Sequence, residues 1–365
     1  MAAYKGIKGF TVQNLASDPT TPASIGQFYF NSTSNTFKYV QPGTVGAWAS
    51  GGNLNTARGQ VAGLGSQSAS LAVGGTTTTA VSALNESYNG SAWTEVGDIN
   101  TARSSLAGSG TTTAGLVVGG TTGTKTANEL WDGSSWSEIA EINTGRYGGT
   151  SIQGTSTATI LFSGATAPST FVVVTESWNG SSWTELNDVN SGRRFFACAG
   201  VQTSALMSGG NGGRLVESWN GTSWTEVADL NTVRTDATGG AGISNTSALV
   251  FGGNPAVANT ESWDGTSWTE VADMATGRNL SAGIGISTSA LCAGAENPVG
   301  GRNATEEFSA AAITDTIKNE GQIYYNSTAG TMNVTAIVYG TGAWASGGNK
   351  NNGVSAAGGA GVLTA

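Results

Sequence analysis

Six arginines recur along the chain at nearly constant spacing, and their guanidinium groups are its strongest candidates for chemistry. They lie 45, 43, 47, 41 and 44 residues apart, and a glutamate follows the same period. A buried arginine persists only when a carboxylate pairs with it, so we predict one arginine–glutamate pair per repeat; the alternative is a ring of open arginines that binds an acidic ligand. The arginines are Arg58, Arg103, Arg146, Arg193, Arg234 and Arg278, and the glutamates are Glu86, Glu129, Glu176, Glu217, Glu261 and Glu306.

Catalysis has no comparable candidates. The chain contains no histidine, which excludes Ser-His-Asp and Cys-His arrangements and nearly all zinc sites. The tract 262–268 resembles the Asp-box of sialidase propellers, but it is one residue short between Asp264 and Gly265. The acids and arginines of the chain repeat with the period, which is typical of architecture. We therefore predict that the protein is not an enzyme and has no catalytic residues, no metal site and no cofactor.

The elements that hold the arginines follow from the period, because about 44 residues is the length of a four-stranded propeller blade. Gly supplies 56 of 365 residues and charged residues only 11%, a composition typical of turn-rich all-β chains. Eleven tryptophans argue against disorder, since disordered chains are poor in aromatic residues. The sequence predicts an all-β, six-bladed propeller over residues 48–310, with flanking segments 1–47 and 311–365.

The repeat from Arg234 to Ala275 shows the expected strands most clearly. The small residues 237–243 suit the innermost strand, and the apolar run 248–251, bounded by a Gly-Gly doublet, suits a strand buried on both faces. Two further strands, 261–263 and 267–270, flank an Asp-Gly dipeptide. Asp-Gly and Asn-Gly favour the type I′ hairpin turn, so we expect that turn here and in four other repeats.

Taken in order, a Gly-Gly doublet, an aromatic residue, a turn, a tryptophan and a closing arginine resemble kelch repeats. The resemblance covers roughly residues 48–308, although the doublet becomes Ser163-Gly164 and Gly294-Ala295 in two repeats. Because each arginine opens an innermost strand, closure of the ring should gather the six near one mouth of the channel. The channel mouths of kelch propellers often hold segments of partner proteins. The resemblance therefore implies that arginines left open at the mouth would bind an acidic partner segment.

Counting tryptophans indicates how the ring closes. An outer-strand tryptophan occurs in five repeats, the first at Trp93, but none follows Phe308 in the sixth. Trp48 lies ten residues before Arg58, as Trp93 lies ten before Arg103. We predict that residues 48–54 pair as the outer strand of the last blade, 278–308, because an N-terminal strand in that place removes two exposed edges.

A second kind of repeat occurs outside the ring, at both ends of the chain. Residues 26–33, Gly-Gln-Phe-Tyr-Phe-Asn-Ser-Thr, are echoed by 321–328, Gly-Gln-Ile-Tyr-Tyr-Asn-Ser-Thr, and each copy runs on to Gly-Ala-Trp-Ala-Ser-Gly-Gly-Asn. Each copy predicts a β-hairpin, which is marginal alone in water and needs a surface to lie on. Dense exposed aromatics mark interfaces, so we predict one at Phe28, Tyr29, Phe30, Tyr324 and Tyr325.

These hairpins and the opening residues 4–13 resemble segments of phage tail-fibre and other virion structural proteins, particularly those of marine, cyanophage-type phages. The resemblance implies a virion protein, assembled in the host cytoplasm, whose partners are other virion proteins or copies of itself, with a host-surface glycan or protein as a further partner. We expect a structural or attachment protein that displays its propeller for binding. Two alternatives stay open: a lectin propeller, whose tryptophan rings would be exposed to carbohydrate, and a cellular kelch scaffold for protein–protein interaction.

Charge and apolar patterning argue against other partners. A net charge of −9 and a pI near 4.5 do not suit nucleic acid, which needs basic stripes. The N-terminal residues have no apolar core of a signal peptide, and no apolar run reaches the roughly 18 residues of a membrane span, so we expect no secretion signal and no membrane segment. The two cysteines, Cys198 and Cys292, fall at different strand positions, and we expect two buried free thiols.

Overall fold

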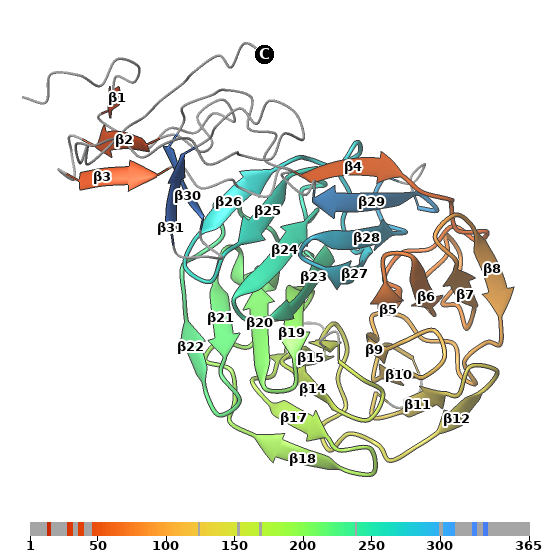
Figure 1. Ribbon diagram of the computed structural model, residues 1–365. Coiled ribbons are helices and arrows are strands. Elements are labelled where there is room, and N and C mark those ends of the chain that lie inside the picture. The colour runs from red at the N-terminus through yellow and green to blue at the C-terminus, as the bar shows by residue number, and fades with distance from the viewer. Residues whose placement is uncertain are drawn as a thin grey trace, which may run out of the picture. The chain divides into compact units, whose positions relative to one another are not determined.

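Six small antiparallel sheets surround a central axis and form a six-bladed β-propeller (Figure 1). The computed structural model describes residues 46–310, apart from 123–124, 152–153, 168–169, 238 and 299–301, together with five strands outside this range. The propeller lies in a compact unit made of Gln41–Thr314, and a second unit consists of Met1–Val40 and Asp315–Ala365. The predicted fold class is therefore confirmed.

Blades 1 to 5 each use four strands that run outward from the axis in chain order. Blade 1 contains β5 (Ala62–Ser66), β6 (Ala69–Val73), β7 (Asn85–Tyr88) and β8 (Trp93–Val96). Blade 2 contains β9 (Ala107–Gly110), β10 (Gly115–Val118), β11 (Asn128–Trp131) and β12 (Trp136–Glu138). Blade 3 contains β13 (Thr150–Ser151), β14 (Thr159–Phe162), β17 (Thr175–Trp178) and β18 (Trp183–Leu186). The chain between β14 and β17 forms a separate small hairpin of β15 (Ala165–Ala167) and β16 (Thr170–Phe171). Blade 4 contains β19 (Ala197–Val201), β20 (Ser204–Ser208), β21 (Val216–Trp219) and β22 (Trp224–Glu226), and blade 5 contains β23 (Gly239–Ser244), β24 (Ser247–Phe251), β25 (Thr260–Trp263) and β26 (Trp268–Val271).

Blade 6 is completed by a strand from the N-terminal side of the ring. Its first three strands are β27 (Ala282–Ile286), β28 (Ser289–Ala293) and β29 (Thr305–Ala310), and its outer strand is β4 (Gly46–Ser50). Phe308 of β29 lies opposite Trp48 in register, so the predicted N-terminal closure is confirmed. The predicted extent of 48–54 is wrong, because β4 begins two residues earlier and ends at Ser50. Leu54 lies beyond the strand, buried between blades 1 and 6.

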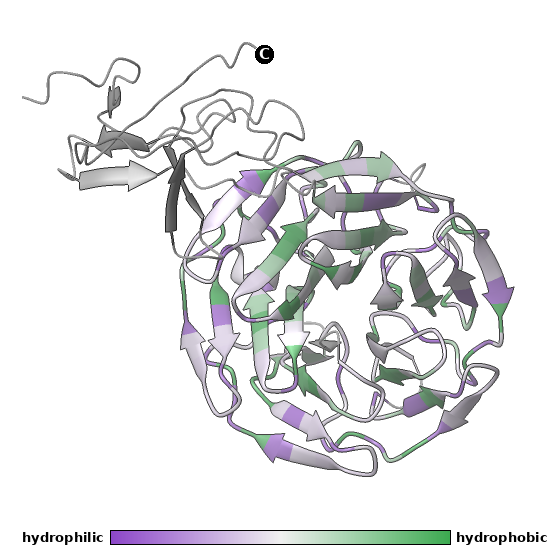
Figure 2. Ribbon diagram, viewed as in Figure 1, coloured by the Kyte–Doolittle hydropathy of each residue, from purple (hydrophilic) through white to green (hydrophobic). Residues whose placement is uncertain are grey.

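Aromatic pairs fill the spaces between blades. In every blade the last aromatic of the third strand faces a tryptophan of the fourth strand, with ring centroids 4.9 to 5.4 Å apart. The Phe308–Trp48 pair occupies this place in blade 6. Figure 2 shows the second strands, such as β24, as strongly hydrophobic, while hydrophilic residues occur on the third strands, such as β29, and on outer strands such as β26. This pattern matches strands buried on both faces within a ring whose rim faces solvent.

The outer hairpins use a turn other than the one predicted. Trp263 pairs with Trp268, so four residues form the loop, and only Gly265 there has a positive φ, of 95°. Asp264 is selected by its side chain instead: Oδ1 accepts hydrogen bonds of 2.8 Å from the backbone amides of Thr266 and Ser267. The corresponding Asn or Asp makes the same two bonds in blades 1 to 4. These are Asx turns rather than type I′ turns.

One of these turns gives a pH-dependent prediction. Hydrogen bonds from the backbone amide of Ser135 and from Ser134 lower the pKa of Asp132 to about 2. The pKa of an aspartate in the unfolded chain is about 3.9. Ionised Asp132 therefore stabilises the fold above pH 4, and this contribution is lost as pH falls towards 2. We expect the melting temperature of the native chain to fall relative to that of Asp132→Asn between pH 4 and 2, with a constant difference above pH 5. A difference that stays constant down to pH 2 would contradict the role of the carboxylate.

The flanking segments contain the two predicted hairpins. Antiparallel pairs are formed by β2 (Phe28–Asn31) with β3 (Thr36–Tyr39) and by β30 (Ile323–Asn326) with β31 (Thr331–Val334). Both pairs have the same register, and β1 (Gln13–Leu15) adds to β2 in parallel. The aromatic side chains proposed as an interface lie outside the described side chains. In the part of the chain that the structure describes, no helix has the length and apolar character to cross a membrane.

Candidate functional site

Each of the six arginines contacts the glutamate of its own blade. The nitrogen–oxygen distances are 2.8 Å for Arg58–Glu86, 2.7 Å for Arg103–Glu129, 2.6 Å for Arg146–Glu176, 3.4 Å for Arg193–Glu217 and 3.0 Å for Arg234–Glu261, and Arg278 pairs with Glu306 in the same way. All six arginine side chains are at most 2% exposed. The alternative of an open arginine ring is therefore not supported, because no guanidinium of the set faces solvent.

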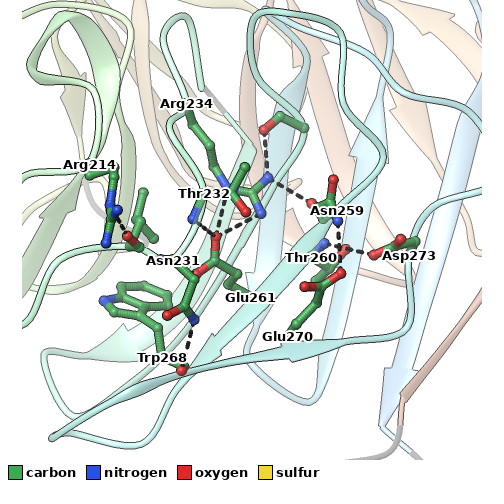
Figure 3. Close-up of polar contacts among 12 residues, drawn as sticks. Arg214, Asn231, Thr232, Arg234, Asn259, Thr260, Glu261, Trp268, Glu270 and Asp273 are labelled. Atoms are coloured by element: carbon green, nitrogen blue, oxygen red, sulfur yellow. Dashed lines mark hydrogen bonds and ion pairs between the residues drawn. The ribbon is translucent and has the colours of Figure 1, made fainter.

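Blade 5 shows what such a pair does in its best-bonded form (Figure 3). Glu261 accepts hydrogen bonds from Arg234 Nε and Nη2, at 3.2 and 3.0 Å, and from the backbone amides of Asn231 and Thr232, at 2.7 and 3.1 Å. Arg234 Nη1 also donates to the carbonyls of Gly252 and Asn259, at 2.8 and 2.7 Å. Burial lowers the pKa of Arg234, and Glu261 opposes that effect. The pair thus joins the loop that enters the blade to the second and third strands.

The arginine backbone explains the Gly-Gly doublet. In all six blades the second doublet residue donates its amide to the carbonyl of the next blade's arginine, at 2.8 to 3.1 Å. A Cβ on Gly252, which has a φ of 70°, would lie 2.5 Å from the carbonyl oxygen of Arg278. Ser163 replaces the first glycine in blade 3, and its hydroxyl donates to the carbonyl of Arg193 at 2.7 Å. The Gly-Gly doublet is therefore selected by a hydrogen bond between neighbouring blades.

Two residues after each arginine, the type of side chain is no longer the same from blade to blade. All six residues there have a positive φ, between 50° and 62°. Five amides of the set donate to the carbonyl of the equivalent residue in the preceding blade, at 2.8 to 3.3 Å, which makes a belt of hydrogen bonds around the axis. The belt residues are Gln60, Ser105, Gly148, Phe195, Asp236 and Leu280. Their backbone role is the same, yet all six side chains differ, so the fold does not dictate their type.

The belt residues lie around the central channel, at the end where the arginine loops enter the blades. A cavity of about 50 Å³ is lined by residues of all six blades, among them Gln60, Ser105 and Phe195. Gln60 accepts a hydrogen bond from Ser105 Oγ at 2.5 Å and donates one to Glu296 at 2.8 Å. Burial raises the pKa of half-buried Asp236, and Asn254 and Arg194 oppose it. We call this end of the channel the belt mouth.

Beside the belt mouth lies a cluster of cations and aromatics, which we call the Arg194 cluster: Lys125, Tyr147, Phe171, Arg194 and Phe195. Arg194 Nη1 donates to Tyr147 Oη at 2.6 Å, and the guanidinium carbon lies 4.8 Å from the ring centre of Phe195 and 5.9 Å from that of Phe171. Lys125 Nζ lies 5.2 Å from the ring centre of Tyr147. Phe171 is 40% exposed, which leaves an aromatic face open to a partner.

The cluster is distinctive in its charge. Apart from the six paired arginines, the only other cations in 46–310 are Lys125, Arg194, Arg214 and Arg302, while acids are spread along the outer strands of blades 1 to 5. Among the described residues, neither Lys125 nor Arg194 lies within 4.0 Å of a carboxylate. A guanidinium held among aromatic rings suits a carboxylate or another anion. The cluster is therefore the best candidate for contact with an acidic group.

The opposite mouth is a weaker candidate. A hollow of about 450 Å³ there is lined by turns rich in Gly, Ser and Thr, and by the exposed residues Ile243 and Ile286. No charged side chain is among the described residues that line it. The hollow therefore offers little basis for selecting one partner over another.

Tryptophan burial bears on the lectin alternative. Nine of the ten described tryptophans are buried, and Trp48 is partly buried. A sugar stacks on an exposed ring, so the prediction that most rings are buried is confirmed and the feature that favoured a lectin is missing in the described residues. Cys198 and Cys292 are buried and are not joined in a disulfide, as predicted, and burial raises the pKa of Cys198 to about 12. No group of three or more potential metal ligands occurs among the described residues.

The fold and the two mouths together define a six-bladed β-propeller with one chemically distinctive channel end. Comparison with known protein families found no matching family model, and comparison with curated proteins found no match. The kelch and phage resemblances consequently rest on the sequence motifs alone. Sequence reasoning missed the Arg194 cluster, although the irregular residues beside each repeated arginine were a visible signal.

Proposed function

We propose that this chain is a non-enzymatic structural or attachment protein of a phage particle, whose flanking segments join the particle while the propeller is displayed for binding. A β-propeller is consistent with a protein-binding role. The observation that carries the proposal is the Arg194 cluster, a singular charged and aromatic surface on an otherwise repetitive scaffold. The phage assignment is supported by the two flanking hairpins, whose sequences resemble virion proteins.

The virion assignment is tested on particles. Antibodies raised against the propeller should label purified particles of the phage that encodes the chain, and peptides of the chain should appear in the mass spectrum of those particles. Position of the label along the particle would then separate a tail fibre from a head decoration. Particles that lack the chain would contradict the proposal and favour a cellular scaffold.

The binding role is tested at Arg194. We expect Arg194→Ala to weaken binding of the fluorescently labelled chain to host cells by roughly thirtyfold, because a central arginine of an interface contributes about 2 kcal/mol or more. Arg214→Ala is the matched control, since Arg214 Nε donates to the carbonyl of Leu230 and has no ring contact among the described residues. Binding titrations on cells measure both. Equal losses in the two variants would move the contact away from the Arg194 cluster.

A further inference from the structure

The exposed apolar residues of the propeller lie at the two ends of its channel. Five large hydrophobic side chains are exposed among the described residues, and two of them, Ile243 and Ile286, line the hollow at the opposite mouth. The other three belong to loops on the side of the belt mouth: Phe171 is 40%, Val173 37% and Val233 53% exposed. These three residues and Arg194 are called the loop patch below.

The propeller repeat does not require the apolar residues of the loop patch. The residue before each repeated arginine is small in the other five blades: Ala57, Ala102, Gly145, Gly192 and Gly277. Only blade 5 places a larger side chain there, Val233. Phe171 and Val173 lie between Arg146 and Arg193, which are separated by 47 residues, the longest of the five spacings. All three are departures from the repeat, and exposed apolar departures of this kind mark interfaces.

The loop of blade 3 packs on the segment that contains Arg194. A Cβ on Gly192 would lie 3.4 Å from Val173 Cγ1, so Val173 lies beside the chain two residues before Arg194. The guanidinium carbon of Arg194 lies 5.9 Å from the ring centre of Phe171. These contacts make one surface in which a cation lies beside two exposed apolar side chains.

A glycine-rich loop of blade 4 connects this surface to Val233. Residues 209–213 have the sequence Gly-Gly-Asn-Gly-Gly and follow β20 directly. The amide of their asparagine donates to the carbonyl of Arg194 at 3.2 Å, and the carbonyl of Gly213 accepts a hydrogen bond from the amide of Arg234 at 3.0 Å. A Cβ on Gly213 would lie 3.8 Å from Val233 Cγ1. The asparagine is thus the only side chain of this loop between Arg194 and Val233.

Charge decides what kind of apolar group the loop patch can receive. Among the described residues, no carboxylate lies within 4.0 Å of Arg194. Asp236 accepts a hydrogen bond from Asn254, at 3.3 Å, rather than from Arg194. Covering a cation with an apolar partner is unfavourable unless the partner supplies a counter-charge. The occupant must therefore bring an acidic group together with its apolar ones.

Neither a second copy of this chain nor a sugar supplies both groups as well as a different protein does. The outer strands of blades 1 to 5 carry exposed acids, but none of the five exposed large hydrophobic residues lies on an outer strand. An acidic sugar could contact Arg194 and stack on Phe171, yet it has no aliphatic side chain to cover Val233. A protein segment with acidic and apolar side chains in succession meets both requirements.

We propose that the loop patch docks a short segment of a different protein, in which an acidic side chain pairs with Arg194 and neighbouring apolar side chains cover the exposed apolar residues of the patch. The inference rests on the proposed binding role of the Arg194 cluster. It adds the identity of the partner, a protein segment rather than a glycan, and extends the contact across blade 4 to Val233.

Labelled peptides test the proposal on the full chain. Four repeats of Glu-Leu-Ser supply both groups, four repeats of Glu-Ser-Ser supply the acid alone, and four repeats of Lys-Leu-Ser reverse the charge. By fluorescence anisotropy we expect the first peptide to bind roughly tenfold more tightly than either control, and Val233→Ala to weaken its binding roughly fivefold. Equal binding of the first two peptides would overturn the proposal, and so would the absence of binding by all three at about 1 mM.

Ile243→Ala is the matched control for Val233→Ala. Ile243 is 55% exposed, close to the 53% of Val233, but it lies at the opposite mouth. Alanine already occupies the place of Val233 in blades 1 and 2, so both variants should melt within about 2 °C of the native chain. We expect only Val233→Ala to weaken binding of the Glu-Leu-Ser peptide, and equal losses in the two variants would overturn the placement of the patch.

Host cells separate this inference from the role of Arg194 itself. Where Arg194→Ala weakens cell binding, Val233→Ala should weaken it roughly fivefold and protease treatment of the cells should abolish it. Binding that resists protease, is lost after periodate oxidation and is unchanged in Val233→Ala would identify an acidic glycan, which overturns the inference and leaves the attachment role intact. Cell binding unchanged in Arg194→Ala would contradict the attachment role as well. A concentration-dependent dimer that Val233→Ala abolishes would identify a second copy of the chain and also overturn the inference.

Discussion

A Glu261→Gln variant is expected to lose about 3 to 5 kcal/mol of unfolding free energy, because it leaves a buried guanidinium without its counter-charge. Arg234 is fully buried and its Nε and Nη2 both donate to Glu261. The backbone amides of Asn231 and Thr232 depend on the same carboxylate. Urea unfolding followed by tryptophan fluorescence measures the loss.

Glu270 is the matched control for this prediction. It lies opposite Glu261 in register but is exposed, and its carboxylate accepts a hydrogen bond from Asn259 at 2.8 Å. Glu270→Gln should cost about 1 kcal/mol or less, as for other surface charges. Glu217→Gln tests the dependence on geometry, since Glu217 lies 3.4 Å from Arg193. Equal small losses at Glu261 and Glu270 would mean that the arginines are hydrated and available to ligands.

The blade architecture could be predicted because one set of local signals occurs many times in phase. A single Gly-Gly doublet or Trp would be weak, but the period near 44 residues aligns them, and each copy corrects the others. The ring closure followed from one missing tryptophan after Phe308 and one surplus tryptophan at Trp48. The end of that strand was misplaced, because Leu54 is as apolar as a strand residue and only packing shows that it turns into the space beside blade 1.

The candidate site could not be predicted by the same reasoning. Lys125 belongs to blade 2, Tyr147 and Phe171 to blade 3, and Arg194 to blade 4, so only the packing of neighbouring blades brings them together. In the sequence each residue of the Arg194 cluster differs from its counterparts in the other repeats, and residues that do not repeat contribute nothing to a repeat pattern. The turn type was predicted wrongly for a related reason. An aspartate at position 264 suits the backbone of a type I′ turn and also the side-chain hydrogen bonds of an Asx turn, and the four-residue loop that separates the two turns is known only from the strand register.

A fragment made of residues 41–314 should fold into a stable monomer that no longer assembles, because the flanks, not the blades, are proposed to make the assembly contacts. The fragment keeps β4 and every described blade contact, and it corresponds to one compact unit of the chain. A closed ring exposes no inner edges, and the outer strands of blades 1 to 5 carry acids that discourage pairing. Differential scanning fluorimetry, light scattering and incorporation into particles measure the outcome.

The matched variant keeps the full chain and replaces Tyr29 and Tyr324, which stand at equivalent places of β2 and β30, by serine. If aromatic contacts of the hairpins drive assembly, this variant should melt as the native chain does and yet fail to join oligomers or particles, since its blades are untouched. An isolated two-stranded hairpin such as β30–β31 is marginal in water, so its presence is best explained by a surface that it binds. A fragment 41–314 that assembles normally would contradict this and would place the interface on the rim of the propeller, where the uncharged edge of β4 is the one outer strand without acids.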